Sequence, residues 1–248
     1  MMQQSPKINS HATLAPLRNV SSCLIAMESV VNRPSHLSGM IAFYGPAGYG
    51  KTTAAIFVAN EFRAYHVEVK STWTQKAFLL NICREMGIQK PAKVIYELAE
   101  QVSEQLASSG RPLIIDEFDH VIKKGYVELV RDLSDGTGAP ILLIGEEQID
   151  ANLQRWERFH RRILDWIPAQ PADMSDAECL RDLYCKSVQI ADDLLTKVVD
   201  VSNGSISRIV SNLDRIQRNT LTQGNNTVNA EQWGNQRLDN GRSPSRRG

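Results

Sequence analysis

Residues 45–52 read Gly45-Pro46-Ala47-Gly48-Tyr49-Gly50-Lys51-Thr52, and this stretch decides the fold of the 248-residue chain. It matches the pattern G-x-x-x-x-G-K-[ST], which forms a loop between a β-strand and an α-helix. The apolar run 40–44 precedes the motif and the helix-forming run 53–59 follows it, as the pattern requires. The sequence therefore predicts a nucleotide-binding protein.

The glycines of this motif allow the backbone to turn tightly, so that successive N–H groups point at anionic oxygens. The following helix adds the positive end of its dipole. Lys51 can reach the β- and γ-phosphates, and Thr52 supplies a hydroxyl ligand for Mg²⁺. We therefore expect ATP and Mg²⁺ to bind here, with nucleotide contacts from Gly45, Pro46, Ala47, Gly48, Tyr49, Gly50, Lys51, Thr52 and Thr53.

A second apolar run ends in acidic residues, in the stretch Arg111-Pro-Leu-Ile-Ile-Asp116-Glu117-Phe-Asp119. Parallel strands deliver the side chains at their carboxyl ends to the edge of the sheet where ligands bind. We expect Asp116 to hold Mg²⁺, directly or through water, and Glu117 to orient and polarise the attacking water of a hydrolysis reaction. Asp119 is interpreted as a helix N-cap or a surface acid.

Strand and helix patterns alternate along the chain, which predicts an α/β fold with a doubly wound, five-stranded parallel sheet. The predicted strands are 40–44, 65–69, 111–116, 140–144 and 163–167. We assign residues 13–168 to this nucleotide-binding domain. Helical patterns at about 175–187, 191–201 and 205–218 predict a small helical lid over residues 172–219. Polar composition predicts disorder at 1–12 and 220–248; the second segment is a solvated tail or an anion-binding arm.

Composition excludes several classes of protein. No apolar run approaches the roughly 18 residues of a membrane span, and the N-terminus has no signal-peptide pattern, so we expect an intracellular protein without membrane contact. The cysteines occur singly, which indicates neither zinc nor a disulfide framework. The charges of the 28 basic and 28 acidic residues cancel, so any binding of nucleic acid must come from local basic patches.

Two segments contain arginines that could contact the γ-phosphate of ATP. Arg158, Arg161 and Arg162 follow the fourth strand, where an arginine can neutralise charge on the nucleotide of a neighbouring subunit. The alternative is a solvent-facing basic helix, and the sequence does not separate the three. Arg208 lies at the start of a predicted lid helix, after a turn at Gly204. Either it contacts the γ-phosphate, so that the lid responds to the nucleotide, or it is an ordinary surface arginine.

Together these motifs resemble the P-loop, Walker B, arginine-finger and sensor-2 elements of AAA+ ATPases over residues 13–218. Within that superfamily, the run from Leu14 to Ile88 resembles the transposition B proteins of Mu-like phages and related transposon ATPases. The resemblance implies a Mg²⁺-dependent ATPase, stimulated by DNA and transposase in the bacterial host cytoplasm. It implies filaments or rings of identical subunits on double-stranded DNA of any sequence, which deliver target DNA to a DDE transposase.

The chain departs from the family pattern in two places. AAA+ proteins commonly carry a polar sensor residue after the fourth strand, whereas here Gly145-Glu146-Glu147-Gln148 follows. Phage B proteins also carry an N-terminal helix-turn-helix domain, for which the roughly 12 residues ahead of the first predicted helix leave no room. We therefore expect slow hydrolysis and expect that domain to be absent.

Contacts with DNA are expected in the segments after the second strand, because relatives that form filaments line their channel with basic and polar residues there. These residues are Lys70, Ser71, Thr72, Lys76, Lys90 and Lys93. The alternative interpretation is a solvated surface. Several weak phosphate contacts, repeated over many subunits, can add up to useful affinity for a neutral chain.

Two other functional classes remain open. One is an AAA+ ATPase of a related branch, such as a secretion-associated or initiator/loader protein. The absence of a membrane segment counts against the first of these, and the absence of a winged-helix domain after the lid counts against the second. The other class is a nucleotide-gated interaction protein with little hydrolysis, which the unusual residues after the fourth strand allow.

Overall fold

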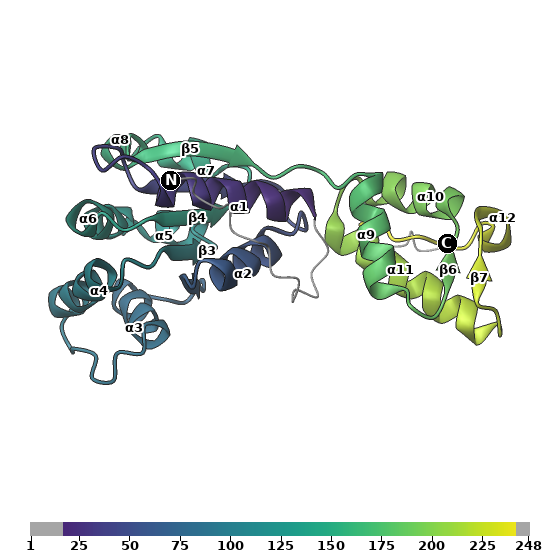
Figure 1. The fold of residues 1–248 in the computed structure, drawn as a ribbon, viewed down its shortest axis with the longest axis horizontal. Helices are drawn as coiled ribbons and strands as arrows, with labels where there is room; N and C mark the ends of the chain where they lie inside the picture. The colour runs from purple at the N-terminus through teal and green to yellow at the C-terminus, as the bar shows by residue number, and fades with distance from the viewer. Residues whose placement is uncertain (1–16, 242–248) are drawn as a thin grey trace, which may run out of the picture.

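The computed structural model describes residues 17–241. They form an elongated molecule in which an α/β domain lies beside a smaller helical domain (Figure 1). The predicted disorder of residues 1–12 lies outside the described residues, as do Leu14, Arg242, Arg246 and Arg247.

The α/β domain is built on five parallel strands in the order β2-β3-β4-β1-β5. Their bounds are β1 Met40–Tyr44, β2 Tyr65–Glu68, β3 Leu113–Asp116, β4 Ile141–Gly145 and β5 Ile163–Pro168. Glu68 pairs with Asp116 and Tyr44 with Gly145, so the carboxyl ends of these strands meet at one edge of the sheet. The prediction of a doubly wound parallel sheet is therefore confirmed.

Helices cover both faces of the sheet, because the inner strands are apolar on both sides. Ile41, Phe43 and Leu142 pack against α1 and α2, whereas Ala42 and Leu143 belong to a second core on the other face. That second core is covered mainly by α3, α4 and α6, with shorter helices at its ends. The helix bounds are α1 Arg18–Val31, α2 Lys51–Glu61, α3 Gln75–Glu85, α4 Ile95–Ser109, α5 Asp119–Lys124, α6 Val127–Thr137, α7 Ile149–Leu153 and α8 Glu157–His160.

The lid contains the predicted helices and additional elements. Its helices are α9 Met174–Tyr184, α10 Asp192–Ser202 and α11 Ile206–Thr222, and a short parallel pair joins β6 Gln189–Ile190 to β7 Thr227–Val228. The helix α12, Ala230–Trp233, follows. A capping box of Asp173 and Asp176 begins α9.

The prediction of a disordered segment from residue 220 is wrong for residues 220–241. The end of α11, the strand β7 and the helix α12 all lie there. Trp233 is buried, and its indole N–H donates to the carbonyl of Gln236 at 3.0 Å. Asn212 of α11 also binds the backbone of Asp239 through both its amide atoms, at 3.0 and 2.6 Å. These contacts order a stretch whose average composition is polar.

Candidate nucleotide-binding site

The phosphate-binding loop connects β1 to α2 and takes the conformation that its glycines allow. Gly48 and Gly50 have φ angles of +84° and +80°, which side chains with a Cβ rarely adopt. Gly50 is the residue directly before α2, so the N-terminus of that helix faces the loop. The ammonium group of Lys51 donates to the carbonyls of Gly45 and Pro46, at 2.7 and 2.9 Å. Burial lowers the pKa of Lys51, while nearby carboxylates, led by Glu117, oppose that shift.

Two carboxylates stand at the end of β3, beside the loop. Asp116 is 2% exposed, and its Oδ1 accepts the backbone N–H of Glu117 at 2.8 Å. Glu117 has a φ of +57°, an uncommon conformation for a residue other than glycine, of the kind found at functional sites. Burial raises the pKa of Glu117, and the neighbouring charge of Asp116 raises it further. The turn therefore holds two carboxyl groups in different environments next to each other.

Asp119 is neither an N-cap nor a surface acid, so the interpretation from sequence is wrong. It is the first residue of α5, its side chain is buried, and its Oδ2 accepts the backbone N–H of Glu146 at 2.8 Å. Local sequence favoured a cap because Asp commonly caps helices. The partner comes instead from the turn after β4, which is distant in sequence.

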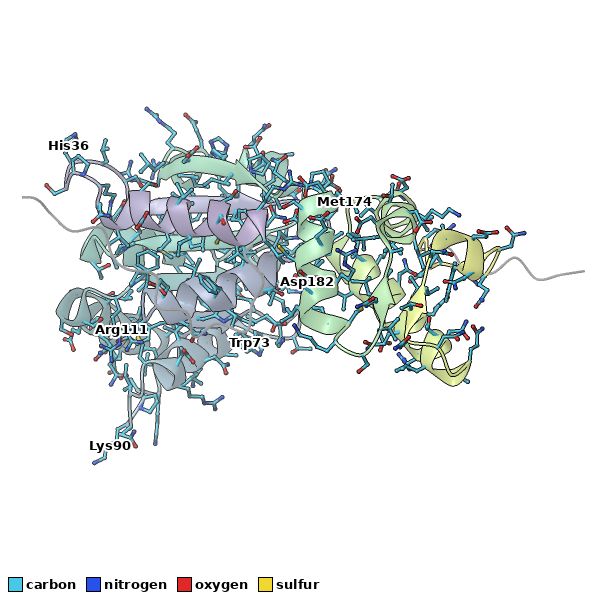
Figure 2. The ribbon with its side chains drawn as sticks, turned by 45° about the vertical axis from the view of Figure 1, so that its right-hand side comes forward. His36, Trp73, Lys90, Arg111, Met174 and Asp182 are labelled. Carbon is cyan, nitrogen blue, oxygen red and sulfur yellow. The ribbon has the colours of Figure 1, made fainter. Side chains whose placement is uncertain are left out.

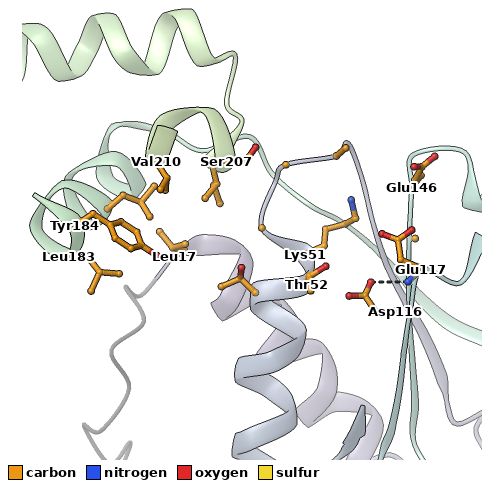
Figure 3. Close-up of a pocket in the computed structure, with 17 residues that line it drawn as sticks. Leu17, Lys51, Thr52, Asp116, Glu117, Glu146, Leu183, Tyr184, Ser207 and Val210 are labelled. Atoms are coloured by element: carbon orange, nitrogen blue, oxygen red, sulfur yellow. Dashed lines mark hydrogen bonds between the residues drawn. The ribbon is translucent and has the colours of Figure 1, made fainter. Parts of the chain in front are cut away.

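A cavity of about 470 Å³ lies between the sheet edge and the lid. Its polar end contains the loop, the two carboxylates and Glu146, while its apolar end lies between α1 and the lid helices (Figure 3). The lining residues are Leu17, Ala47, Gly48, Gly50, Lys51, Thr52, Thr53, Asp116, Glu117, Gly145, Glu146, Leu180, Leu183, Tyr184, Ile206, Ser207 and Val210. A polar end for phosphates and an apolar end for a base suit a nucleotide.

The lid side of this cavity was missed by the sequence analysis. Leu17, Leu180, Leu183, Tyr184 and Val210 have the helical spacing of ordinary core residues, and their positions along the chain do not indicate a shared cavity. Tyr184 is 50% exposed, so its ring is free to contact a base.

The residues at the polar end of the cavity are suited to binding a Mg²⁺ ion. Thr52 and Asp116 both line it, and Oδ2 of Asp116 is buried with no hydrogen-bond partner among residues 17–241. Carboxylate and hydroxyl oxygens are the ligands that Mg²⁺ prefers. These two residues would hold the ion, which would neutralise phosphate charge.

Arg208 lies outside the residues that line the cavity. Its guanidinium group donates to the carbonyl of Ser202 at 3.5 Å and lies against Gly241. Ser207, one position earlier on α11, faces the loop instead, and its backbone N–H donates to the carbonyl of Gly48 at 3.1 Å (Figure 3). The predicted role of Arg208 as a γ-phosphate reporter stays a prediction.

The three candidate trans-acting arginines lie together on the surface around α8. Arg162 pairs with Asp135 at 3.0 Å, and Arg161 pairs with Glu157 at 3.8 Å. The side chain of Arg158 is exposed and makes no hydrogen bond or ion pair within residues 17–241. Arg161 and Arg162 also line a surface hollow with Gly39, Gly138 and Ile163, at the start of β1, β4 and β5. The cluster thus faces away from the carboxyl edge that holds the nucleotide cavity.

The residues predicted to contact DNA fall into two groups. Lys70, Ser71, Thr72 and Lys76 lie around the start of α3, whereas Lys90 and Lys93 lie in the loop that follows it. All six are exposed, and Lys70 pairs with Glu68. Trp73 and Lys90 mark the two groups in Figure 2, where Lys90 is at the tip of a projecting loop. The helix of 11 residues between them is about 16 Å long.

Known proteins share part of this sequence and this fold. A family model described as the AAA domain matches residues 35–153. The matched segment contains the phosphate-binding loop and the pair Asp116 and Glu117, and it resembles an AAA domain. No helix within residues 17–241 has the length and apolarity needed to cross a membrane.

Similar proteins include a subunit of a replication factor and two solved ORC structures. Replication factor C subunit 1 of Saccharomyces cerevisiae is 24% identical over 189 residues, which are 75% of this chain and 22% of the yeast protein. The chain therefore spans about a fifth of the length of that relative. The Aeropyrum pernix ORC2 protein matches with a TM-score of 0.69 and 16% identity, covering 90% of this chain and 68% of that chain. The A. pernix ORC1 protein in complex with DNA matches with a TM-score of 0.63 and 16% identity, covering 90% and 65%. These structural likenesses show the fold.

Proposed function

We propose that this protein is an ATP-hydrolysing AAA+ ATPase that acts on double-stranded DNA as an oligomer. The observation that carries the proposal is the shared cavity of Lys51, Thr52, Asp116 and Glu117, which the lid closes on one side. A nucleotide in that cavity would contact both domains. Binding and hydrolysis would therefore change the relation between the lid and the sheet.

The residues at the polar end divide the chemistry among them. The N–H groups of the loop and the ammonium group of Lys51 bind the phosphates and stabilise the charge that develops on them. Thr52 and Asp116 would hold Mg²⁺, which would neutralise phosphate charge. Glu117 accepts a hydrogen bond from the attacking water and orients it toward the γ-phosphate. Glu146 stands where a polar neutral residue is common, and its negative charge near the γ-phosphate favours slow turnover.

Oligomerisation is part of the proposal because the arginine cluster lies away from the chain's own cavity. The hollow that includes Arg161 and Arg162 lies at the amino ends of the strands, and the cavity lies at their carboxyl ends. An arginine of this cluster can reach a γ-phosphate only if that nucleotide belongs to a neighbouring subunit. Arg158 suits the role best because its guanidinium group is exposed and unpaired within residues 17–241.

DNA is the proposed partner on the strength of the similar structures and of the exposed lysines. Two of those structures hold DNA, one of A. pernix ORC1 in complex with DNA and one of Drosophila ORC bound to DNA. Lys90 and Lys93 sit on a projecting loop without ion pairs within residues 17–241, next to the exposed apolar residues Val94, Ile95 and Tyr96. Lysines of this kind bind phosphates irrespective of sequence.

The test measures ATP turnover and DNA binding in the same preparation. We expect Mg²⁺-dependent turnover that rises with duplex DNA of arbitrary sequence, and DNA binding with ATP that is lost with ADP. Lys51→Ala should abolish both, while Lys123→Ala, an exposed lysine on α5, should change neither. Equal DNA binding by Lys51→Ala and the unmodified protein would contradict control by nucleotide.

The biological process has two candidates. The origin-recognition and clamp-loader likenesses favour an initiator or loader ATPase. The resemblance of residues 14–88 to phage transposition B proteins favours delivery of target DNA to a DDE transposase. Negative-stain images with ATP separate them: continuous filaments on DNA support transposition, and single closed or open rings support the initiator or loader class.

A further inference from the structure

Leu17, Arg18 and Asn19, at the start of α1, contact the cavity, the lid and the phosphate-binding loop respectively. Leu17 lines the apolar end of the cavity. The backbone N–H and the Nε of Arg18 donate to the carboxylate of Asp176 in α9, at 2.9 and 3.0 Å. Asn19 contacts the phosphate-binding loop. The first turn of α1 therefore touches the base end of the cavity, the lid and the loop together.

The side chain of Asn19 forms hydrogen bonds through both amide atoms. Its Nδ2 donates to the carbonyls of Tyr49 and Gln170, at 2.9 and 2.8 Å, and its Oδ1 accepts the backbone N–H of Gln170 at 2.8 Å. Only this orientation of the amide satisfies its partners, because two carbonyls face the nitrogen and one N–H faces the oxygen. Asn19 is 3% exposed, so a lost partner could not be replaced by bulk water.

The lid holds the neighbouring carbonyl of the loop. The N–H of Ser207, in the first turn of α11, donates to the carbonyl of Gly48. A Cβ at Gly48 would lie 2.6 Å from the hydroxyl oxygens of Ser205 and Ser207, so the lid is packed directly on the loop. The carbonyls of Gly48 and Tyr49 are thus held from outside by two different elements.

These contacts determine where the N–H groups of the loop point. In a trans peptide the carbonyl and the following N–H lie in one plane and point in opposite directions. Holding the carbonyls of Gly48 and Tyr49 outward therefore turns the N–H groups of Tyr49 and Gly50 inward, toward the place of the phosphates. Any rotation of these peptides on binding phosphate would pull on Asn19 and Ser207.

We propose that Asn19 is a positioning residue that couples the phosphate-binding loop to the lid. It joins the Tyr49–Gly50 peptide to the peptide of Gln170, in the segment between β5 and α9. Arg18, the residue before Asn19, extends this connection to the start of α9 through its two hydrogen bonds to Asp176. Phosphate in the loop then fixes the lid through hydrogen bonds behind the loop, without a side chain from the lid reaching the phosphate. The inference rests on the proposed binding of ATP.

Asn19→Asp tests the coupling, because it keeps the shape of the side chain and replaces the donating nitrogen with an oxygen that faces two carbonyls. We expect the Kd for ATP with Mg²⁺ to rise roughly tenfold or more. Asn32→Asp is the matched control, since it makes the same chemical change at the exposed end of α1. Its Kd should stay that of the unmodified protein.

The decisive measurement is the distance between the lid and the α/β domain. Spin labels at Glu104→Cys in α4 and Gln223→Cys after α11, in a Cys179→Ser background, report the distance between the two domains by pulsed EPR. We expect saturating ATP to change the distance distribution when Asn19 is present and to leave it unchanged in Asn19→Asp. A full response of the lid in saturated Asn19→Asp would overturn the coupling, even if affinity falls.

The same titrations separate this inference from the proposed function. If the protein with Asn19 binds no ATP, the proposed function itself fails. If it binds ATP and its lid does not respond, only the coupling fails. Should Asn19→Asp not fold, as judged by circular dichroism, hydrogen exchange on the unmodified protein decides instead. ATP should slow exchange of the Gln170 amide together with the amides of the loop; protection of the loop alone would overturn the coupling.

Discussion

Asp119 accepts the backbone N–H of Glu146 at 2.8 Å, and this hydrogen bond joins the start of α5 to the turn after β4. A Cβ at Gly145 would lie 2.7 Å from the same carboxylate oxygen, so the turn has no room for a larger residue. The contact places Glu146 at the polar end of the cavity, beside Glu117. Two acids that follow different strands are thereby brought to one phosphate site.

Removing this carboxylate should destabilise the fold. Asp119→Ala removes the acceptor of a partly buried hydrogen bond to the N–H of Glu146, which costs about 1 kcal/mol of unfolding free energy. Urea unfolding measures the loss. Asp119→Asn keeps an acceptor oxygen and should recover most of the stability; equal losses in the two variants would contradict the role of the hydrogen bond.

Glu117→Gln should lower the turnover of ATP by roughly 10²–10⁴-fold, because it removes the group that accepts a hydrogen bond from the attacking water. Binding of ATP should persist, since Lys51 and the loop are unchanged. Steady-state turnover and a fluorescent-nucleotide titration separate the two effects. Comparable losses in both would indicate a role in binding.

The pH dependence follows from the raised pKa of Glu117. Burial, and then the charge of Asp116, make its carboxylate harder to ionise in the folded protein than at the ordinary value of 4.5. Because the ionised form is the active one, kcat/KM should fall with decreasing pH through a midpoint above 4.5. An acid limb at or below that pH would contradict the assignment of Glu117.

Arg158→Ala should reduce turnover by roughly 10³-fold or more while leaving ATP binding intact, because the arginine would serve a neighbour's nucleotide. Mixing it with Lys51→Ala should restore part of the activity, since each variant supplies what the other lacks. Arg161→Ala is the control, because that side chain is already paired with Glu157. No recovery in the mixture would contradict action in trans.

Lys90→Ala and Lys93→Ala should weaken DNA binding equally for all sequences. Each lost phosphate contact should reduce the slope of log K against log salt by about 0.9. Fluorescence anisotropy over a range of salt concentrations measures the slope. Lys186→Ala, an exposed lysine on the lid, should leave it unchanged, and a similar change there would indicate nonspecific loss of charge.

The sequence by itself determined the sheet and the polar end of the cavity. Residues 45–52 and the pair Asp116 and Glu117 are contiguous motifs that each follow an apolar strand. Parallel strands bring such motifs to one edge whatever the details of packing, so local pattern was sufficient.

Tertiary structure alone decided what surrounds those motifs. Whether Ser207 or Arg208 faces the loop depends on the rotation of α11, which its packing against the rest of the lid sets. Asn19 reads as an ordinary polar residue near a helix start, and its role depends on two carbonyls far along the chain. The order of residues 220–241 likewise depends on Trp233 and Leu238 finding apolar partners in the lid. Contacts between distant segments leave little trace in local sequence, because any polar or apolar residue of suitable size could have occupied the same position.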